Sequence, residues 1–156
     1  MSDLRDLYQE VILDHNRQPR NFGRLAGANC SAEGFNPLCG DKLTVYLKLV
    51  DGVIEGVSFE GTGCAISTAS ASIMTDFVRG KSRDEALKTF ELFHDMITAP
   101  PDHASHRAVL DLGKLSVFSG VAEFPARVKC ATLAWHALKA ALSQGGAAAP
   151  TPVSTE

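Results

Sequence analysis

The feature that most constrains the fold is a run of alternating apolar and polar residues beside one tight turn. Residues 43–50 follow the two-residue period of a strand with one buried face. The apolar members are Leu43, Val45, Leu47 and Leu49, and Thr44, Tyr46 and Lys48 lie between them. Asp51-Gly52 follows, a pair that tolerates the positive φ angles of a two-residue hairpin turn. Residues 53–59 return as the partner strand, and a short strand expected at 28–35 completes a three-stranded antiparallel sheet.

Helical patterns flank this sheet in the sequence. Residues 4–15 carry an apolar stripe at three- and four-residue spacing. Residues 65–78 follow a Gly-Thr-Gly-Cys turn, and Ser82 with Glu85 forms a capping box for the next helix. Pro125 suits the first turn of a last helix. One helix, a block of strands and then several helices predict an α+β domain, in which the small sheet packs against the helices.

Composition limits the class of protein. In this 156-residue chain, residues 1–143 are expected to form one domain, and the low-complexity tail 144–156 is expected to be disordered. A net charge of −3 argues against a nucleic-acid binder. No apolar run approaches the roughly 20 residues of a membrane span, and the start lacks the apolar core of a signal peptide. We therefore expect a cytoplasmic chain that binds neither nucleic acid nor membrane.

The basic segment at residues 14–23, with the sequence DHNRQPRNFG, interrupts the helical pattern before the first strand. Pro19 and Gly23 end the periodicity. Two interpretations stay open for this segment, a solvated loop and a docking surface.

The chain has four cysteines: Cys30, Cys39, Cys64 and Cys130. In a reducing compartment, metal or thiol chemistry competes with the alternative that cysteines are small buried hydrophobic residues. Cys39 precedes the strand at 43–50 and Cys64 follows its antiparallel partner, so both leave the same end of the hairpin. Asp41 is two residues from Cys39 and could project to the same side of an extended segment.

Three thiolates and one carboxylate would make a tetrahedral zinc site. The helix that starts after Cys64 would favour the thiolate over the thiol, and Arg127 and Lys129 would add positive charge near Cys130. The spacing of these cysteines matches no short metal motif, so the residues alone leave the buried-cysteine alternative open. The five histidines are scattered and are expected to be surface or capping residues.

Four segments, taken together, carry a family resemblance. They read LYQEVILDHNRQPRNFG, NPLCGDKLTVYL, GTGCAISTASASIMTDFV and FPARVKCATLAWHAL. The sequence resembles the IscU/NifU-like family of iron–sulfur cluster assembly proteins over roughly residues 4–142, and it is most similar to the SufU branch. The resemblance implies a three-stranded antiparallel sheet with helices packed on it.

The resemblance also implies the site. It assigns Cys39, Asp41, Cys64 and Cys130 as ligands of Zn²⁺, or alternatively of iron in a [2Fe–2S] cluster. Cys30 matches no functional position and is expected to be a core residue. The implied function is a zinc-dependent sulfurtransferase that accepts persulfide sulfur on Cys39 from a SufS-type cysteine desulfurase, while the alternative is a scaffold for cluster assembly. Whether such an acceptor counts as an enzyme is left open.

The same resemblance indicates partners and two departures from the IscU branch. Downstream SUF cluster assembly proteins are the expected recipients, and Arg127 either assists thiolate release or is an ordinary surface arginine. Lys129 stands where IscU-type scaffolds have a histidine before the last cysteine, and the stretch EFPARVK replaces their chaperone-recognition motif. An extra segment at about residues 96–117 is typical of SufU.

Overall fold

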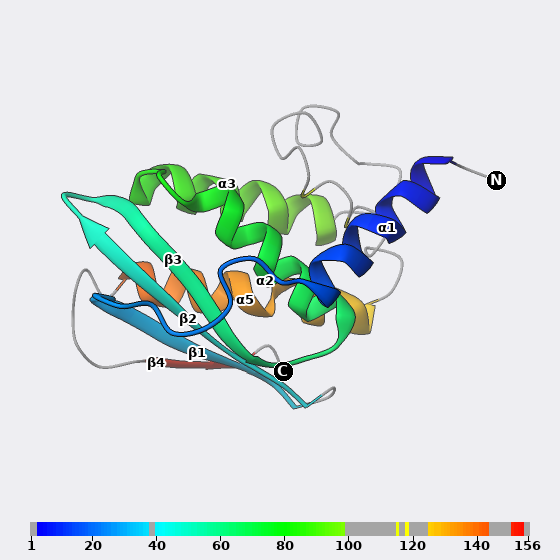
Figure 1. The fold of residues 1–156 in the computed structure, drawn as a ribbon, viewed down its shortest axis with the longest axis horizontal. Helices are drawn as coiled ribbons and strands as arrows, with labels where there is room; N and C mark the ends of the chain where they lie inside the picture. Colours follow the sequence, from blue (N-terminus) through cyan, green and yellow to red (C-terminus); the bar gives the residue numbers. More distant parts are fainter. Residues whose placement is uncertain are drawn as a thin grey trace.

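The structure is a computed structural model that describes residues 3–37, 40–98, 115, 118, 125–143 and 151–154. Four helices and four strands are described (Figure 1). They are α1 (Asp3–Arg17), β1 (Cys30–Asn36), β2 (Asp41–Val50), β3 (Val53–Thr62), α2 (Ala65–Val78), α3 (Arg83–Thr98), α5 (Pro125–Ser143) and β4 (Thr151–Ser154). The helices at 4–15 and 65–78 and the start of the last helix at Pro125 therefore lie where the sequence predicts them.

The predicted antiparallel sheet is confirmed. β2 pairs with β1 on one side and with β3 on the other, both antiparallel. At the β2–β3 turn, Asp51 has a φ of 52° and Gly52 a φ of 78°, which are the positive values that the two-residue turn requires. At the opposite end of β2, Asn36 pairs with Asp41. The strand ends at Asn36, Asp41 and Thr62 therefore gather at one end of the sheet.

A fourth strand extends the sheet at β1, giving the order β3-β2-β1-β4. β4 runs parallel to β1, and Ala32 pairs with Thr151 (Figure 1). β4 consists of Thr151–Ser154, within the tail 144–156 that is expected from its composition to be disordered, and the rest of 144–156 lies outside the described residues. An uncovered β1 edge would leave backbone N–H and C=O groups without partners, and β4 supplies them. Pro152 is compatible with this position because β4 is the edge strand.

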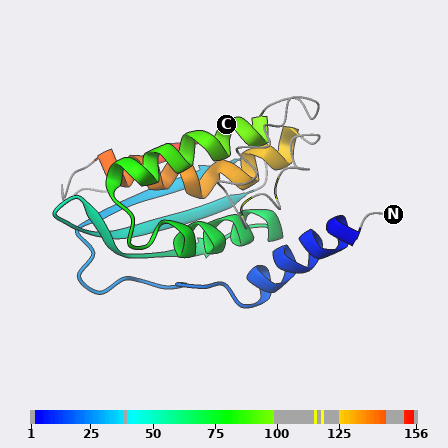
Figure 2. The ribbon, with the colours of Figure 1, turned by 90° about the horizontal axis from the view of Figure 1, so that it is seen from above.

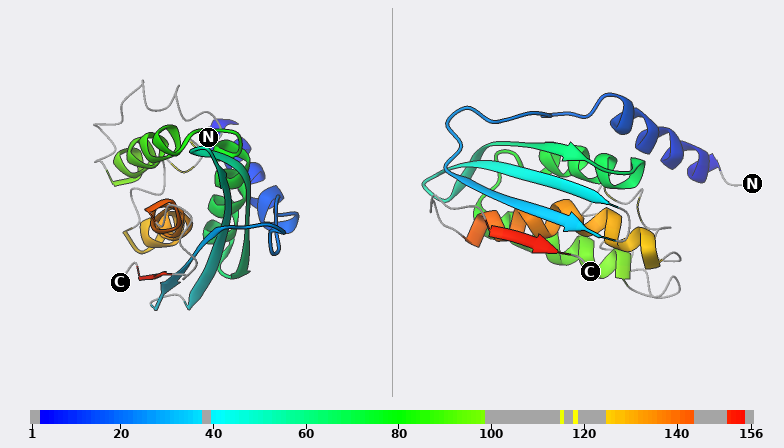
Figure 3. Two further views of the ribbon diagram at one scale, coloured as in Figure 1. Left: turned by 90° about the vertical axis from the view of Figure 1, so that its left-hand side faces the viewer. Right: turned by 90° about the horizontal axis from the view of Figure 1, so that it is seen from below.

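The helices α2, α3 and α5 cover one face of the sheet (Figures 2 and 3). The core between them is centred on Trp135 of α5, which is fully buried and stacks on Phe93 of α3 with ring centroids 4.8 Å apart. The indole Nε1 of Trp135 donates a hydrogen bond to Ser70 Oγ at 3.2 Å, and Ser70 Oγ donates to the carbonyl of Ala131 at 2.6 Å. These two bonds fix α2 against α5. The helix start after Cys64 and the helix that carries Cys130 are thereby held in one rigid layer.

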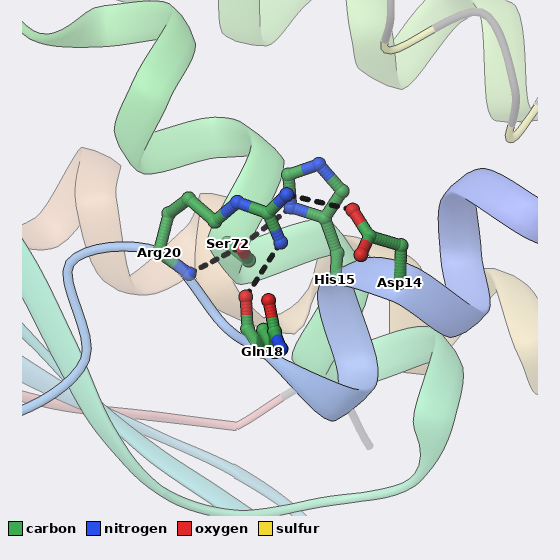
Figure 4. A network of polar contacts seen from close by, with 5 residues as sticks. All are labelled: Asp14, His15, Gln18, Arg20 and Ser72. Atoms are coloured by element: carbon green, nitrogen blue, oxygen red, sulfur yellow. Dashed lines mark hydrogen bonds and ion pairs between the residues drawn. The ribbon is translucent and has the colours of Figure 1, made fainter.

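The helix α1 packs against α2 through a buried polar network (Figure 4). His15 is fully buried, and its Nδ1 lies 2.7 Å from Ser72 Oγ. The backbone N–H of Arg20 donates to the same oxygen at 2.8 Å, and the guanidinium of Arg20 pairs with Asp14 at 2.6 Å. The basic segment 14–23 is thus attached to α2 rather than being a loop surrounded by solvent.

The segment after α1 then covers the free edge of β3. The backbone N–H of Phe59 donates to the carbonyl of Asn21 at 3.0 Å, and the N–H of Gly23 donates to the carbonyl of Phe59 at 2.7 Å. Phe22, between them, keeps 53% of its surface exposed. The polar backbone of this segment is therefore used within the fold, whereas the side chain of Phe22 faces outward; the interpretation as a docking surface stays a prediction.

The predicted capping box is present at the start of α3. Ser82 N–H donates to the Glu85 carboxylate at 3.0 Å, and Glu85 N–H donates to Ser82 Oγ at 3.1 Å. The hydrogen bond that the Glu85 carboxylate accepts from the Ser82 backbone N–H, together with its side-chain hydrogen bond with Ser82, lowers the pKa of Glu85 from its usual value.

Of the extra segment 96–117, the structure describes the end of α3 and Leu115, which is fully buried. None of the described helices is long and apolar enough to cross a membrane.

Gly61 controls the approach of β3 to β2 beside the gathered strand ends. Its φ is 133°, and a β-carbon at this position would lie 2.1 Å from the backbone oxygen of Lys42. We expect Gly61→Ala to lower the free energy of unfolding by about 3 kcal/mol, because it combines backbone strain with a clash that no side-chain movement relieves. Urea denaturation of the chelator-treated protein measures this change.

Gly52→Ala is the matched control. Gly52 also has a positive φ, of 78°, but no atom lies within 4 Å of the added β-carbon. This variant should therefore show only the cost of the left-handed backbone, about 1 kcal/mol. Equal losses for the two variants would contradict a close approach of the two strands at Gly61.

Candidate metal centre

The gathered strand ends bring together a carboxylate and two thiols. Asp41 is the first residue of β2, Cys64 directly precedes α2, and Cys130 lies in the second turn of α5. One ligand atom from each of these residues lies within 4.8 Å of the others. Asp41 and Cys130 are buried and Cys64 is half-buried, so the group is open to solvent on the side of Cys64.

The pairing of β2 with β3 positions Asp41 beside Cys64. Lys42 pairs with Thr62. Asp41, the residue before Lys42, therefore lies beside the residues that follow Thr62 and lead to Cys64. Asp41 Oδ1 accepts a hydrogen bond from the backbone N–H of Cys64 at 2.9 Å, and Asp41 Oδ2 lies 3.8 Å from Cys64 Sγ. Asp41 and Cys64 therefore lie together at the end of the hairpin where the sequence predicts Cys39 and Cys64 to meet, and Cys39 itself lies outside the described residues.

Cys64 is the N-cap residue of α2. Its backbone is extended, with φ −71° and ψ 173°, and its sulfur accepts a hydrogen bond from the N–H of Ser67 at 3.4 Å. The first turn of α2 contains no acidic residue. The N-terminus of a helix carries partial positive charge, and the N–H of Ser67 orients the Cys64 sulfur at this N-terminus.

Cys130 is held from two sides. Its Sγ lies 3.8 Å from Nδ2 of Asn36, and it lies 3.6 Å from the carbonyl oxygen of Ala126 in the preceding turn. Asn36 is fully buried and pairs with Asp41 across the β1–β2 connection. An amide N–H that points at a sulfur orients it and favours its charged form. Sequence reasoning missed Asn36, although its register opposite Asp41 is the signal that could have found it.

A second residue that sequence reasoning missed is Ser67, in the first turn of α2. Its Oγ is buried and has no hydrogen-bond partner among the described residues. A β-carbon on Gly63 would lie 3.0 Å from this oxygen and 3.5 Å from Asp41 Oδ1. The glycine therefore leaves open a small space that is lined by a hydroxyl and a carboxylate.

Three other candidate residues from the sequence lie outside this group or outside the described part of the chain. Cys39, the expected fourth ligand and sulfur acceptor, lies outside the described residues. Arg127 is exposed on α5, three residues before Cys130. Cys30 is 3% exposed at the far end of β1, opposite Leu47, and it does not join the group of Asp41, Cys64 and Cys130. Its position agrees with a core role.

The donor set is suited to a divalent metal ion. Zinc in proteins is bound by cysteine sulfur and by aspartate oxygen, and its structural sites have four ligands in a tetrahedron. The described residues offer two sulfurs and one carboxylate, with Asn36 and the helix N-terminus as supports. The buried hydroxyl of Ser67 and the space at Gly63 lie beside them. The residues present therefore fit a zinc ion, provided that one more ligand is supplied.

Comparisons with known proteins agree with this arrangement. Residues 7–131 match the family described as "NifU-like N terminal domain". The chain is 42% identical to the iron–sulfur cluster assembly scaffold protein IscU of Streptococcus pyogenes serotype M1, over 92% of this chain and 87% of that protein. It is also 42% identical to the zinc-dependent sulfurtransferase SufU of Bacillus subtilis, over 93% of this chain and 97% of that protein.

A solved structure supports the same relationship. The N-terminal part of a nitrogen-fixing NifU-like protein from Brucella abortus superposes with a TM-score of 0.77 and 28% identity, covering 92% of this chain and 96% of the other. The resemblance to the IscU/NifU-like family, with a relative in its SufU branch, is thus confirmed by sequence and by fold. The chain belongs to the family of NifU-like N-terminal domains.

Proposed function

We propose that this chain is an iron–sulfur cluster assembly protein that acts as a zinc-dependent sulfurtransferase and accepts persulfide sulfur from a SufS-type cysteine desulfurase. The observation that carries the proposal is the convergence of the Asp41 carboxylate with the thiols of Cys64 and Cys130 within 4.8 Å. The relative from Bacillus subtilis that is named a zinc-dependent sulfurtransferase matches this chain over almost its whole length. We place the protein in the cytoplasm, with downstream SUF proteins as recipients of the sulfur.

Asp41, Cys64, Cys130 and Cys39 are the proposed zinc ligands. Cys39 is two residues from Asp41, and the reach of the chain keeps their Cα atoms within about 7 Å of each other. A zinc ion bound here would supply positive charge that keeps the ligand thiols deprotonated, and its binding energy would stabilise the folded state. Cys64 and Cys130 are suited to remain as ligands, because the N–H of Ser67 and the amide of Asn36 orient their sulfurs.

Cys39 is the proposed nucleophile. Its thiolate attacks the outer sulfur of the persulfide on the desulfurase and forms a new sulfur–sulfur bond. The sulfur–sulfur bond of the desulfurase persulfide breaks, and its electron pair leaves with the thiolate of the desulfurase cysteine. The transferred sulfur, with its proton, remains on Cys39 as a persulfide. No external oxidant or reductant is needed, because the outer sulfur passes from the persulfide of one cysteine to the thiolate of another.

Arg127 is a proposed assisting residue. It is exposed at the start of α5, three residues before Cys130, so the two side chains share one face of the helix. A guanidinium at this place could pair with the Cys39 thiolate when it leaves the metal, or with an anionic group of the desulfurase. An exposed arginine that only keeps the surface hydrated is the simpler alternative.

A second candidate function has its own support. The relative from Streptococcus pyogenes is named an iron–sulfur cluster assembly scaffold protein, and it is as similar to this chain as the sulfurtransferase is. Cysteine thiolates also hold [2Fe–2S] clusters. In this alternative the same four residues would hold the iron of a growing cluster, and Cys39 would stay on the metal instead of taking sulfur.

Removal and return of zinc test the proposal against this alternative. We expect the chelator-treated chain to lose its stimulation of the cognate desulfurase by at least about tenfold, and one equivalent of zinc to restore it. Alanine release from cysteine measures the turnover. Full stimulation without zinc, together with a stable [2Fe–2S] absorbance after reconstitution, would sink the sulfurtransferase function and support the scaffold.

The role of Cys39 is tested by a variant in the same reaction. We expect Cys39→Ala to abolish persulfide formation on the chain, as read by mass spectrometry after incubation with desulfurase and cysteine, because the attacking sulfur is missing. Cys30→Ala is the matched control, since Cys30 is buried and outside the proposed site, and it should still accept sulfur. Persulfide found only on Cys130 of the unaltered chain would show that the acceptor is misassigned.

A further inference from the structure

We propose that Ser67 is a positioning residue whose hydroxyl is kept without a partner so that it can donate a hydrogen bond to the Cys64 sulfur when that sulfur binds metal. This inference rests on the proposed zinc site and adds to it a residue outside the ligand set. It also gives Cys64 a fixed role, that of the ligand that stays on the metal while Cys39 takes sulfur.

The buried hydroxyl of Ser67 is exceptional within its own helix. Of all the buried side-chain oxygens and nitrogens in the described residues, Ser67 Oγ alone lacks a hydrogen-bond partner. Ser70 Oγ donates to the carbonyl of Ala131, and Ser72 Oγ contacts His15 and Arg20. A buried hydroxyl without a partner costs free energy that an alanine would not cost. Its presence therefore points to a partner that exists in another state of the site.

The geometry indicates which atom that partner is. Ser67 is three residues after the N-cap Cys64, and its own N–H already donates to Cys64 Sγ at 3.4 Å. The hydroxyl and Asp41 Oδ1 both lie within 3.5 Å of the point where a β-carbon on Gly63 would stand. Asp41 Oδ1 already accepts the N–H of Cys64. The Cys64 sulfur, which the Ser67 N–H already holds against this residue, is the inferred acceptor.

The change of state is the binding of metal. With its proton in place, the Cys64 thiol is itself the donor toward Asp41 Oδ2, at 3.8 Å. When a metal ion replaces that proton, the sulfur is charged and can only accept hydrogen bonds. A hydroxyl that donates to a charged sulfur forms a charge-assisted bond, which is stronger than a bond between neutral groups. The hydroxyl has no hydrogen-bond partner in the described structure, so it must move toward the sulfur for this bond to form.

The consequence is a difference between the cysteines of the site. A sulfur that accepts two hydrogen bonds from the first turn of α2 is oriented and has less charge to offer an incoming electrophile. Cys64 would therefore stay on the metal, and the transferred sulfur would be directed to Cys39. Ser67 acts through Cys64 and touches neither the persulfide nor the desulfurase.

The experiment is Ser67→Ala, compared with Ser70→Ala on the same helix. For Ser67→Ala we expect a melting temperature of the chelator-treated protein that is unchanged or higher, because no hydrogen bond is lost there. Zinc affinity, measured by competition with a chromophoric chelator, should fall by about tenfold. The sulfur-to-metal charge-transfer band of the cobalt-substituted protein should shift to longer wavelength, because the sulfur has lost a hydrogen-bond donor.

Ser70→Ala should give the reverse pattern. Its hydroxyl is already paired with Ala131 and Trp135, so the melting temperature of the chelator-treated protein should fall while the cobalt band stays in place. Ser67→Ala with unaltered zinc affinity and an unaltered cobalt band would overturn the inference. A clear loss of melting temperature for chelator-treated Ser67→Ala would also overturn it, because the hydroxyl would then have a partner without metal. Neither readout involves the desulfurase, so failure of the proposed function would be seen separately.

Discussion

The hydrogen bond from the Cys64 N–H to Asp41 Oδ1, at 2.9 Å, is the contact on which the proposed site depends. It joins the first residue of β2 to the N-terminus of α2. Asp41 is 1% exposed, and a carboxylate is rarely buried without hydrogen bonds because its desolvation is costly. The backbone N–H and the positive end of the helix offset that cost. The same bond leaves Asp41 Oδ2 directed at the Cys64 sulfur, so a structural contact also brings together two of the proposed metal ligands.

The remainder of the fold keeps this pair in register with Cys130. Asn36 and Asp41 face each other at the paired ends of β1 and β2, and the amide of Asn36 reaches Cys130 on α5. Ser70 bonds to Ala131, the residue next to Cys130, so that α2 and α5 cannot slide past each other without losing a buried hydrogen bond. The β-sheet edges are covered by β4 and by the segment after α1. A rigid layer thus carries Cys64 and Cys130, which agrees with their proposed role as permanent ligands.

Local patterns predicted most of the fold, and contacts between distant elements limited the prediction of the site. The alternation of residues 43–50 and the Asp51-Gly52 turn predicted the hairpin. The hairpin in turn predicted that Cys39 and Cys64 leave its same end, with Asp41 two residues from Cys39, before any relative was considered. Cys130 could not be placed that way, because its approach depends on the packing of α5 against α2, and it entered through the family resemblance. Asn36 and Ser67 were missed because an amide and a hydroxyl carry no metal-ligand pattern. β4 was missed because a low-complexity segment gains its structure from the edge of β1, not from its own composition.

The crystal structure of the zinc-loaded chain, with anomalous diffraction measured at the zinc absorption edge, tests the metal centre most directly. The account predicts one anomalous peak per chain, bound by Asp41, Cys64 and Cys130 together with Cys39. The expected zinc–sulfur distances are about 2.3 Å and the zinc–oxygen distance is about 2.0–2.2 Å. A peak at another place on the chain would contradict the account. Zinc near Cys130 that is not bound by Asp41 and Cys64 would also contradict it.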